Sequence, residues 1–253
     1  MPDIYEFYSS LTMAHMIEHE ADVKRTCTNF RLKLIPKLEK LNFQVKDGNW
    51  LEFGAGWGRN IKALELLGFR SIRGIDISKE QVELSKKLGV RSIDLVEEGR
   101  DLTELYGRAC FDGVLAIDVI EHLSIEQIQA FALQFRRVIK SNGLIVIQVP
   151  NDLAPFNPVP SGDITHRRAF TASSLKQIFA LFGAEMIFVE GMPFPGSGIV
   201  YRLRNVLVSV LLRPLIWFLS VLLYGNVGRV YIEPNLIAVG QVTSKGSGDA
   251  NCG

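Results

Sequence analysis

Apolar and polar residues follow two different periods along most of this chain. From residue 49 onward, short apolar runs typical of strands alternate with stretches in which apolar residues recur every three or four positions, as on amphipathic helices. The pattern predicts strands at residues 49–53, 71–77, 90–96, 111–118, 144–149, 185–189 and 236–242. It predicts helices at residues 59–67, 79–88 and 125–140, the last capped by Ser124, and another that starts at Thr171 or Ser173 and ends before Gly183.

Residues 10–41 carry a helical pattern of their own before the alternation begins. We therefore divide the chain into a helical extension at residues 1–46, one α/β domain at residues 47–243, and a small polar tail at 244–253 that we expect to be disordered. Strands that alternate with helices predict a parallel sheet covered on both faces. In such sheets ligands bind beyond the carboxyl ends of the strands, which places the ends near residues 53, 76, 118 and 150 along one rim.

Composition narrows the class of protein. The 253 residues, 47% of them hydrophobic, suffice for a substantial core in one large domain. Lys and Arg number 28 against 27 Asp and Glu, so there is no basic excess and we expect no nucleic-acid partner. Cys27, Cys110 and Cys252 are too far apart for a metal site or a disulfide framework, which favours a reducing compartment. The opening residues, MPDIYEFYSS, lack the basic and apolar segments of a secretory signal, so we expect a cytoplasmic protein.

The stretch WLEFGAGWGRN at residues 50–60 joins the first strand to a helix through three closely spaced glycines. Glycine removes the Cβ atoms where a ligand must approach the backbone, and it tolerates the positive φ of a tight turn. Asp76 ends the second strand about 20 residues later, where a carboxylate can accept hydrogen bonds from a ribose diol. These features together indicate a nucleoside-containing ligand; the structural alternative is a plain turn with Asp76 capping the next helix.

Two nucleoside cofactors fit this description, and Glu52 distinguishes them. NAD carries a pyrophosphate that favours a helix N-terminus, whereas S-adenosylmethionine carries a cationic sulfonium and an amino-acid end. A carboxylate two residues before the first glycine suits the cationic ligand. The G-x-G-x-G spacing also departs from the G-x-G-x-x-G of dinucleotide-binding proteins, which disfavours a dehydrogenase.

Over residues 48–190 the chain resembles the class I S-adenosylmethionine-dependent methyltransferases. LEFGAGWG resembles their glycine loop, GIDIS their ribose-binding strand end, RDL their adenine-binding acid, FDGVLAIDVIEHL their fourth strand, and NGLIVIQVPN their fifth. The resemblance implies a Rossmann-like seven-stranded α/β sheet, mostly parallel with the last strand antiparallel, and S-adenosylmethionine as cofactor. It implies cofactor contacts from Glu52, Gly54, Gly56, Gly58, Asp76, Ile77, Asp101 and Leu102, with Asp118 close to the reactive end.

A narrower resemblance concerns the methyl acceptor. GDITHRRAFTASSLKQIFALFGAE and the later YIEPNLIAVGQV are similar to segments of bacterial methyltransferases from polysaccharide and glycolipid gene sets. This resemblance implies O-methylation of a sugar hydroxyl in a glycan or lipid-linked glycan. Two alternatives stay open, namely a lipophilic acceptor of quinone or phenol type and a catalytically silent scaffold that keeps the fold.

A sugar hydroxyl is weakly acidic, so its methylation needs a positioned base, and histidine is the usual one. We expect His166, in the loop after the fifth strand, to be the base, with His122 the second candidate. The structural alternatives are a loop-ordering hydrogen bond for His166 and a helix-start packing role for His122. Arg168 is a candidate for an acidic or phosphorylated acceptor, or else a solvated charge. His15 and His19 lack a third ligand, so we expect a solvated helix face there and no metal ion.

An insert of about residues 199–228 lies between the last two strands. It contains the apolar stretch VLVSVLLRPLIWFLSVLL at residues 206–223. Arg213-Pro214 interrupts the stretch, and a single membrane crossing would leave the final strand across the bilayer from its sheet. The remaining interpretations are two short helices hinged at Pro214 on the inner face of a membrane, a lid over the acceptor, a homodimer surface, or internal packing. Arg202 and Arg204, with Arg213, suit anionic headgroups.

Overall fold

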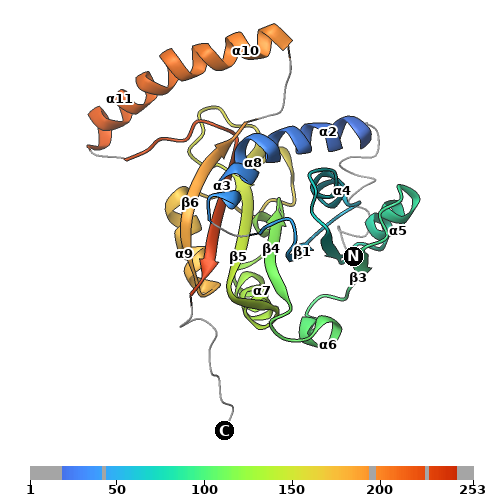
Figure 1. Ribbon diagram of the computed structural model, residues 1–253. Helices are drawn as coiled ribbons and strands as arrows, with labels where there is room; N and C mark the ends of the chain where they lie inside the picture. Colours follow the sequence, from blue (N-terminus) through green and yellow to red (C-terminus); the bar gives the residue numbers. More distant parts are fainter. Residues whose placement is uncertain (1–18, 42–43, 194–197, 226–227, 244–253) are drawn as a thin grey trace.

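The computed structural model of the chain describes residues 19–41, 44–193, 198–225 and 228–243. Its centre is a seven-stranded sheet (Figure 1) whose strands are β1 (Asn49–Phe53), β2 (Ser71–Asp76), β3 (Ile93–Leu95), β4 (Phe111–Ile117), β5 (Ile139–Pro150), β6 (Ala184–Met192) and β7 (Asn235–Val242). The strand order is β3-β2-β1-β4-β5-β7-β6. The first five strands are parallel, and β7 runs antiparallel to both β5 and β6. The predicted Rossmann-like fold with an antiparallel last strand is confirmed.

Helices cover both faces of this sheet, as predicted. They are α4 (Arg59–Leu66), α5 (Lys79–Lys87), α6 (Leu102–Tyr106), α7 (Ile125–Val138), α8 (Val159–Gly162) and α9 (Ala172–Leu181), with a 3-10 turn η2 (Ile120–His122). Successive residues of β4 point to opposite faces. Val114 and Ala116 join the core under α7 and α9, whereas Leu115 and Ile117 join the core that includes α4 side chains.

Element ends differ from the predicted ones where tertiary contacts override the local pattern. β3 covers only Ile93–Leu95 of the predicted 90–96, because Val90 packs against the glycine loop instead of pairing with β2. β5 starts at Ile139, directly after α7, and its pairing with β4 shifts register between Phe111 and Gly113. Ser124 and Thr171 cap α7 and α9 through capping boxes, as their positions predicted.

The N-terminal segment is helical where the structure describes it. It comprises α2 (His19–Asn29), a π-helical turn η1 (Phe30–Leu34) and α3 (Ile35–Glu39), and α2 packs on α4. The expectation of a solvated face is wrong for His19, whose ring lies edge-on to Trp57 with centroids 4.7 Å apart. His15, Cys252 and the tail at 244–253 lie outside the described residues.

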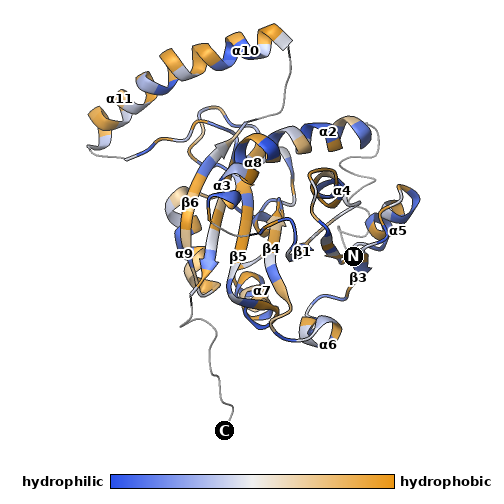
Figure 2. Ribbon diagram, viewed as in Figure 1, coloured by the Kyte–Doolittle hydropathy of each residue, from blue (hydrophilic) through white to orange (hydrophobic). Residues whose placement is uncertain are grey.

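The apolar insert is one continuous helix rather than the two hinged helices that the sequence suggested. α10 (Gly198–Leu207), a π-helical turn η3 (Val208–Leu212) and α11 (Arg213–Tyr224) follow one another without a break. The wider π-helical turn directly before Pro214, in which the amide of Arg213 donates to Val208, accommodates the missing N–H of the proline. None of their residues is buried, so internal packing is wrong as well. Figure 2 shows the helix apolar along most of its length and standing off the sheet.

Both ends of the insert connect to the rim side of the sheet. Asn235, where β7 begins, pairs with Pro150 at the carboxyl end of β5 and with Met192 at the end of β6. The helix therefore leaves and returns at the edge where the parallel strands end, and Figure 1 shows it lying beyond that edge.

Candidate functional site

The glycine loop after β1 needs glycine for both conformation and space. Gly54, Gly56 and Gly58 all have positive φ, at 64°, 54° and 89°. A Cβ on Gly54 would lie 2.5 Å from Cγ2 of Val119, and one on Gly58 would lie 2.8 Å from Cγ1 of Val90. The loop thus packs closely on the turn after β4 and keeps its backbone open to the rim.

Asp76, at the end of β2, braces this loop. Its Oδ2 accepts a hydrogen bond of 2.7 Å from the amide of Gly56, and its Oδ1 accepts one of 2.8 Å from the amide of Ser78. Burial raises the pKa of Asp76, while these amides oppose the rise. Ile77 follows with its side chain half exposed, at 47%, although it is apolar. This is the arrangement expected if Asp76 and Ile77 meet a nucleoside, and their contact with it stays a prediction.

Glu52 is a fully buried carboxyl that lacks half of its hydrogen bonds. Its Oε1 accepts a hydrogen bond of 2.5 Å from Asn60 Nδ2 on α4, whereas its Oε2 has no hydrogen-bond partner among the described residues. Burial raises the pKa of Glu52 from its ordinary value of 4.5 to about 8, with the nearby charges of Asp76 and Asp118 adding to the rise. Arg59 opposes this rise but is ion-paired with Asp118. A buried carboxylate without a cation of its own is unfavourable, so this position fits a positively charged ligand group.

Asp118 extends the acidic rim beyond β4. It is a non-glycine residue with a φ of 57°, a conformation that Asp and Asn tolerate better than most. Its Oδ1 accepts a hydrogen bond of 2.9 Å from Gln148 Nε2 on β5, and Arg59 lies 3.5 Å from its Oδ2. The charge of Asp118 raises the pKa of both Glu52 and Glu121, so Asp118 lies near both the glycine loop and the next group of side chains.

Glu121, His122 and His166 form that next group. One ligand atom from each lies within 4.8 Å of those from the other two, and the two imidazole centroids are 4.7 Å apart. Glu121 is 1% exposed and its Oε2 has no hydrogen-bond partner. Burial raises the pKa of Glu121 well above its ordinary value, and burial together with His166 lowers the pKa of His122. The lowered pKa favours the neutral form of His122, the form that a base or a metal ligand needs.

Hydrogen bonds fix the orientation of both imidazoles. The single hydroxyl proton of Thr165 is donated to Asp163 at 2.6 Å, so its oxygen accepts the contact of 2.8 Å from Nδ1–H of His122. His166 Nδ1 lies 3.1 Å from the carbonyl oxygen of Val159, which can only accept. These contacts place an N–H on Nδ1 of each ring, so that in the neutral tautomer the lone pair lies on Nε2.

The sequence brought His122 and His166 forward but missed Glu121. The backbone amide of Arg167 donates to the carbonyl of Glu121 at 2.8 Å, which ties the loop before α9 to η2. A carboxylate directly before His122 at the end of a buried strand was the available signal. Arg168 is half-buried and its Nε has no partner among the described residues, so its predicted contact with an acidic acceptor stays a prediction.

The structure gives Asp101 and Leu102 other partners than the glycine loop. Asp101 caps α6, accepting from the amide and hydroxyl of Thr103 and from Arg137. The amide of Leu102 donates to Gln134 Oε1 at 3.1 Å. Their predicted role beside adenine stays a prediction.

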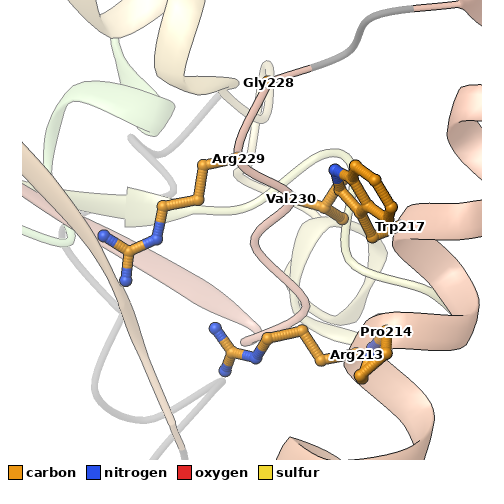
Figure 3. A pocket seen from close by; sticks show the side chains of 6 residues that line it. All are labelled: Arg213, Pro214, Trp217, Gly228, Arg229 and Val230. Atoms are coloured by element: carbon orange, nitrogen blue, oxygen red, sulfur yellow. The ribbon is translucent and has the colours of Figure 1, made fainter.

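A hollow of about 340 Å³ lies away from these residues, between α11 and the chain that leads to β7. Figure 3 shows its lining, which consists of Arg213, Pro214, Trp217, Gly228, Arg229 and Val230. None of these side chains belongs to the rim described above, so the hollow is a feature of the insert.

The residues around the glycine loop fit S-adenosylmethionine. The unpartnered Oε2 of Glu52 suits a cationic amino-acid end, the loop without Cβ atoms admits close approach of a ligand to the backbone, and the carboxylate of Asp76 suits the hydroxyls of a ribose. A pyrophosphate would instead place its negative charge beside the buried carboxyl of Glu52 and gain no charge pairing from it.

Comparison with known proteins agrees with this chemistry. The family described as a methyltransferase domain matches residues 17–188, more than half of the chain. No curated protein matches the chain. Among solved structures, a SAM-dependent methyltransferase from Archaeoglobus fulgidus is similar with a TM-score of 0.60 at 16% identity, covering 86% of this chain and 94% of that one.

A second solved structure is a SAM-dependent methyltransferase from Thermotoga maritima, described as a possible histamine N-methyltransferase. It has a TM-score of 0.55 at 13% identity and covers 94% of this chain and 97% of its own. At such identities the similarity shows the fold alone. The fold similarity, the family match and the acidic site at the glycine loop agree. The chain belongs to the methyltransferase-domain family and is an S-adenosylmethionine-dependent methyltransferase of the class I fold.

Proposed function

We propose that this methyltransferase transfers its methyl group to a sugar hydroxyl of a lipid-linked glycan. The observation that carries the proposal is the pair of oriented imidazoles, His122 and His166, on the rim next to Asp118. A hydroxyl of low acidity must lose its proton as the oxygen is methylated. When bound, S-adenosylmethionine supplies a methyl group on a cationic sulfonium, which leaves as a neutral thioether.

The chain's own residues divide the remaining work. Glu52 and Asp76 hold the cationic end and the ribose, and Asp118 lines the passage from them to the imidazoles. The Nε2 lone pairs of His122 and His166 face the acceptor's proton. Arg168, with its buried and unpartnered Nε, suits an acceptor that carries an acidic or phosphate group.

The lipid-linked part of the proposal rests on the insert. The helix Gly198–Tyr224 is long and apolar enough to span a membrane and has no buried share. It contains Arg202 and Arg204 and no acidic residue, so its charge complements anionic headgroups. Arg213, the third arginine of the helix, is ion-paired with Glu233 instead. It also borders the rim end of the sheet, so lipid contact would bring a lipid-borne acceptor to the active side.

A transmembrane path for this helix conflicts with the sheet. β6 and β7 are neighbours along their whole length, so both ends of the insert stay on one side. A return across the hydrocarbon by residues 225–234 would expose backbone groups that no helix or barrel satisfies. We therefore infer peripheral insertion on the inner face of a membrane, in a cytoplasmic protein. A homodimer through the same helix is the competing interpretation.

The acceptor chemistry is tested by replacing each imidazole. With methyl-labelled S-adenosylmethionine and a lipid-linked glycan extract, His166→Ala and His122→Ala should each lower turnover by roughly 10²- to 10⁴-fold while cofactor affinity is kept. His19→Ala, on α2 beside Trp57, serves as the control. Full activity in both variants would contradict a sugar hydroxyl and point to a more acidic phenol.

Membrane contact is tested by vesicle sedimentation. The protein should pellet with anionic vesicles, less with neutral ones, and be partly released by salt, because each arginine contributes about 1 kcal/mol that salt screens. Leu211→Asp with Leu222→Asp should abolish pelleting, whereas Leu66→Asp, at an equally exposed site on α4, should not. A soluble wild-type dimer that the double variant dissociates would instead assign the helix to self-association.

A further inference from the structure

We propose that Glu121, His122 and His166 form a binding site for a divalent first-row transition metal ion, such as Mn²⁺, Co²⁺ or Zn²⁺. Binding of the ion follows from these side chains alone. Its role, which is to activate the acceptor hydroxyl, rests on the proposed function.

The first argument is convergence. Candidate ligand atoms of all three residues lie within 4.8 Å of one another. Around an ion with bonds of about 2.0–2.2 Å, neighbouring ligand atoms lie about 3–3.5 Å apart. Side-chain rotations that move the ligand atoms by little more than an ångström would close this difference. The backbone bond from Arg167 to Glu121 already holds the two segments together.

The second argument is the state of Glu121. Its side chain is 1% exposed, and its Oε2 has no hydrogen-bond partner among the residues that the structure describes. Buried carboxylates are normally paired, hydrogen-bonded or bound to a metal ion. The neighbouring Asp118 and Asp163 add negative charge and make a cation more favourable still.

The third argument is the orientation of the imidazoles. A histidine that binds a metal through one nitrogen donates its other N–H to a carbonyl, a carboxylate or a similar acceptor. His166 does this to Val159, and His122 does it to the Thr165 hydroxyl, which in turn is held by Asp163. Both rings therefore keep the Nε2 lone pair, the atom that would bind the ion.

The donor set selects the class of ion and leaves room for a substrate. Two imidazoles with one carboxylate suit Zn²⁺, Fe²⁺, Co²⁺ or Mn²⁺ better than Mg²⁺ or Ca²⁺, which favour oxygen ligands. Three protein ligands leave at least one position open. An acceptor hydroxyl in that position becomes more acidic.

The resulting step balances without any further reagent. The O–H bond of the coordinated hydroxyl breaks and its proton passes to water. The oxygen then forms a bond to the methyl carbon, and the carbon–sulfur electron pair stays on sulfur. The cation thereby replaces a histidine base. Activation by a cation and catalysis by a histidine base differ in the role of Glu121. It binds the ion in the first mechanism and has no direct role in the second.

The test uses untagged full-length protein with the demethylated cofactor product, so that no acceptor is needed. The electron paramagnetic resonance signal of free Mn²⁺ should decrease by an amount that corresponds to one ion per chain. Bound Co²⁺ should give visible absorption bands typical of nitrogen and oxygen ligands. Glu121→Gln and His166→Gln should each weaken Mn²⁺ binding by more than about 100-fold, and Thr165→Val by about 10- to 100-fold. Glu65→Gln, on the exposed side of α4, should bind like the wild type.

Each outcome decides one proposal without deciding the other. Failure of the wild type to bind Mn²⁺, Co²⁺ or Zn²⁺ with a dissociation constant below about 0.1 mM overturns the cation site and leaves a histidine base in place. Binding that survives Glu121→Gln and Thr165→Val overturns this ligand set. Binding as predicted with no methylation of any hydroxyl supports the cation site and contradicts the proposed function. If Glu121→Gln fails to fold, Thr165→Val and His166→Gln carry the test.

Discussion

Substitution of Glu52 by glutamine should change the pH dependence of both stability and cofactor binding. In the free protein the pKa of Glu52 rises from 4.5 to about 8 because the carboxyl is fully buried. A group whose pKa is raised in the folded state stabilises the fold, and this contribution to the unfolding free energy is fully present below pH 4.5 and is lost as pH rises through about 8. The unfolding free energy should therefore fall by about 1.4 kcal/mol per pH unit in this window, up to about 5 kcal/mol in total.

Glu52→Gln removes the ionisation but keeps the shape and the acceptor for Asn60. The unfolding free energy of the variant should not show this decrease. Without cofactor, the stability of the variant relative to the wild type should therefore increase as pH rises from 5 to 8. With S-adenosylmethionine bound, the wild type should instead be more stable than the variant. The reason is that the cationic ligand stabilises the ionised carboxylate of Glu52, which therefore loses its proton when the ligand binds.

Thermal unfolding across this pH range, with and without cofactor, measures both effects. Calorimetry in two buffers of different ionisation enthalpy counts the released proton directly. Parallel pH profiles for wild type and variant, together with cofactor binding that releases no proton, would refute the role given to Glu52.

Three further substitutions test individual contacts. Asp76→Ala should weaken cofactor binding by roughly 10- to 100-fold, since charged hydrogen bonds contribute about 1.5–3 kcal/mol, and unchanged affinity in a calorimetric titration would place the ribose elsewhere. Gly54→Ala should destabilise the fold by about 1–3 kcal/mol more than Gly89→Ala in denaturant unfolding. The reason is that both glycines have positive φ but only a Cβ at Gly54 meets a side chain, and equal effects would contradict this. Ser124→Ala should lose about 1 kcal/mol from the α7 capping box, seen as a lower melting temperature with cofactor affinity unaltered, and an altered affinity would tie α7 to the site.

The sequence predicted the fold where local periodicity and tertiary structure agree. The strands β1, β2 and β4 and the capped helices α7 and α9 fall close to their predicted places because apolar spacing and capping residues are local signals. β3 is shorter than predicted because Val90 is used to pack against Gly58, a contact that no local pattern encodes.

The candidate site divides in the same way. Glu52, the glycine loop and Asp76 were accessible because they form one short motif followed by a strand end. The cluster of Glu121 with His122 and His166 was not, because it depends on how the loop after β5 folds back onto η2. The insert shows a third case, in which Arg213-Pro214 suggested a break but the helix continues through a π-helical turn.

The proposed methyl transfer to an oxygen of a glycan is tested by identifying the labelled product. The purified protein would be incubated with isotopically methyl-labelled S-adenosylmethionine and lipid-linked glycan extracts, and the products analysed by fragmentation mass spectrometry. Label should appear in a methyl ether on a sugar ring with the wild type and be absent with His166→Ala. Label on nitrogen, sulfur or a phenolic oxygen, or cofactor binding with no label transferred, would contradict the proposal.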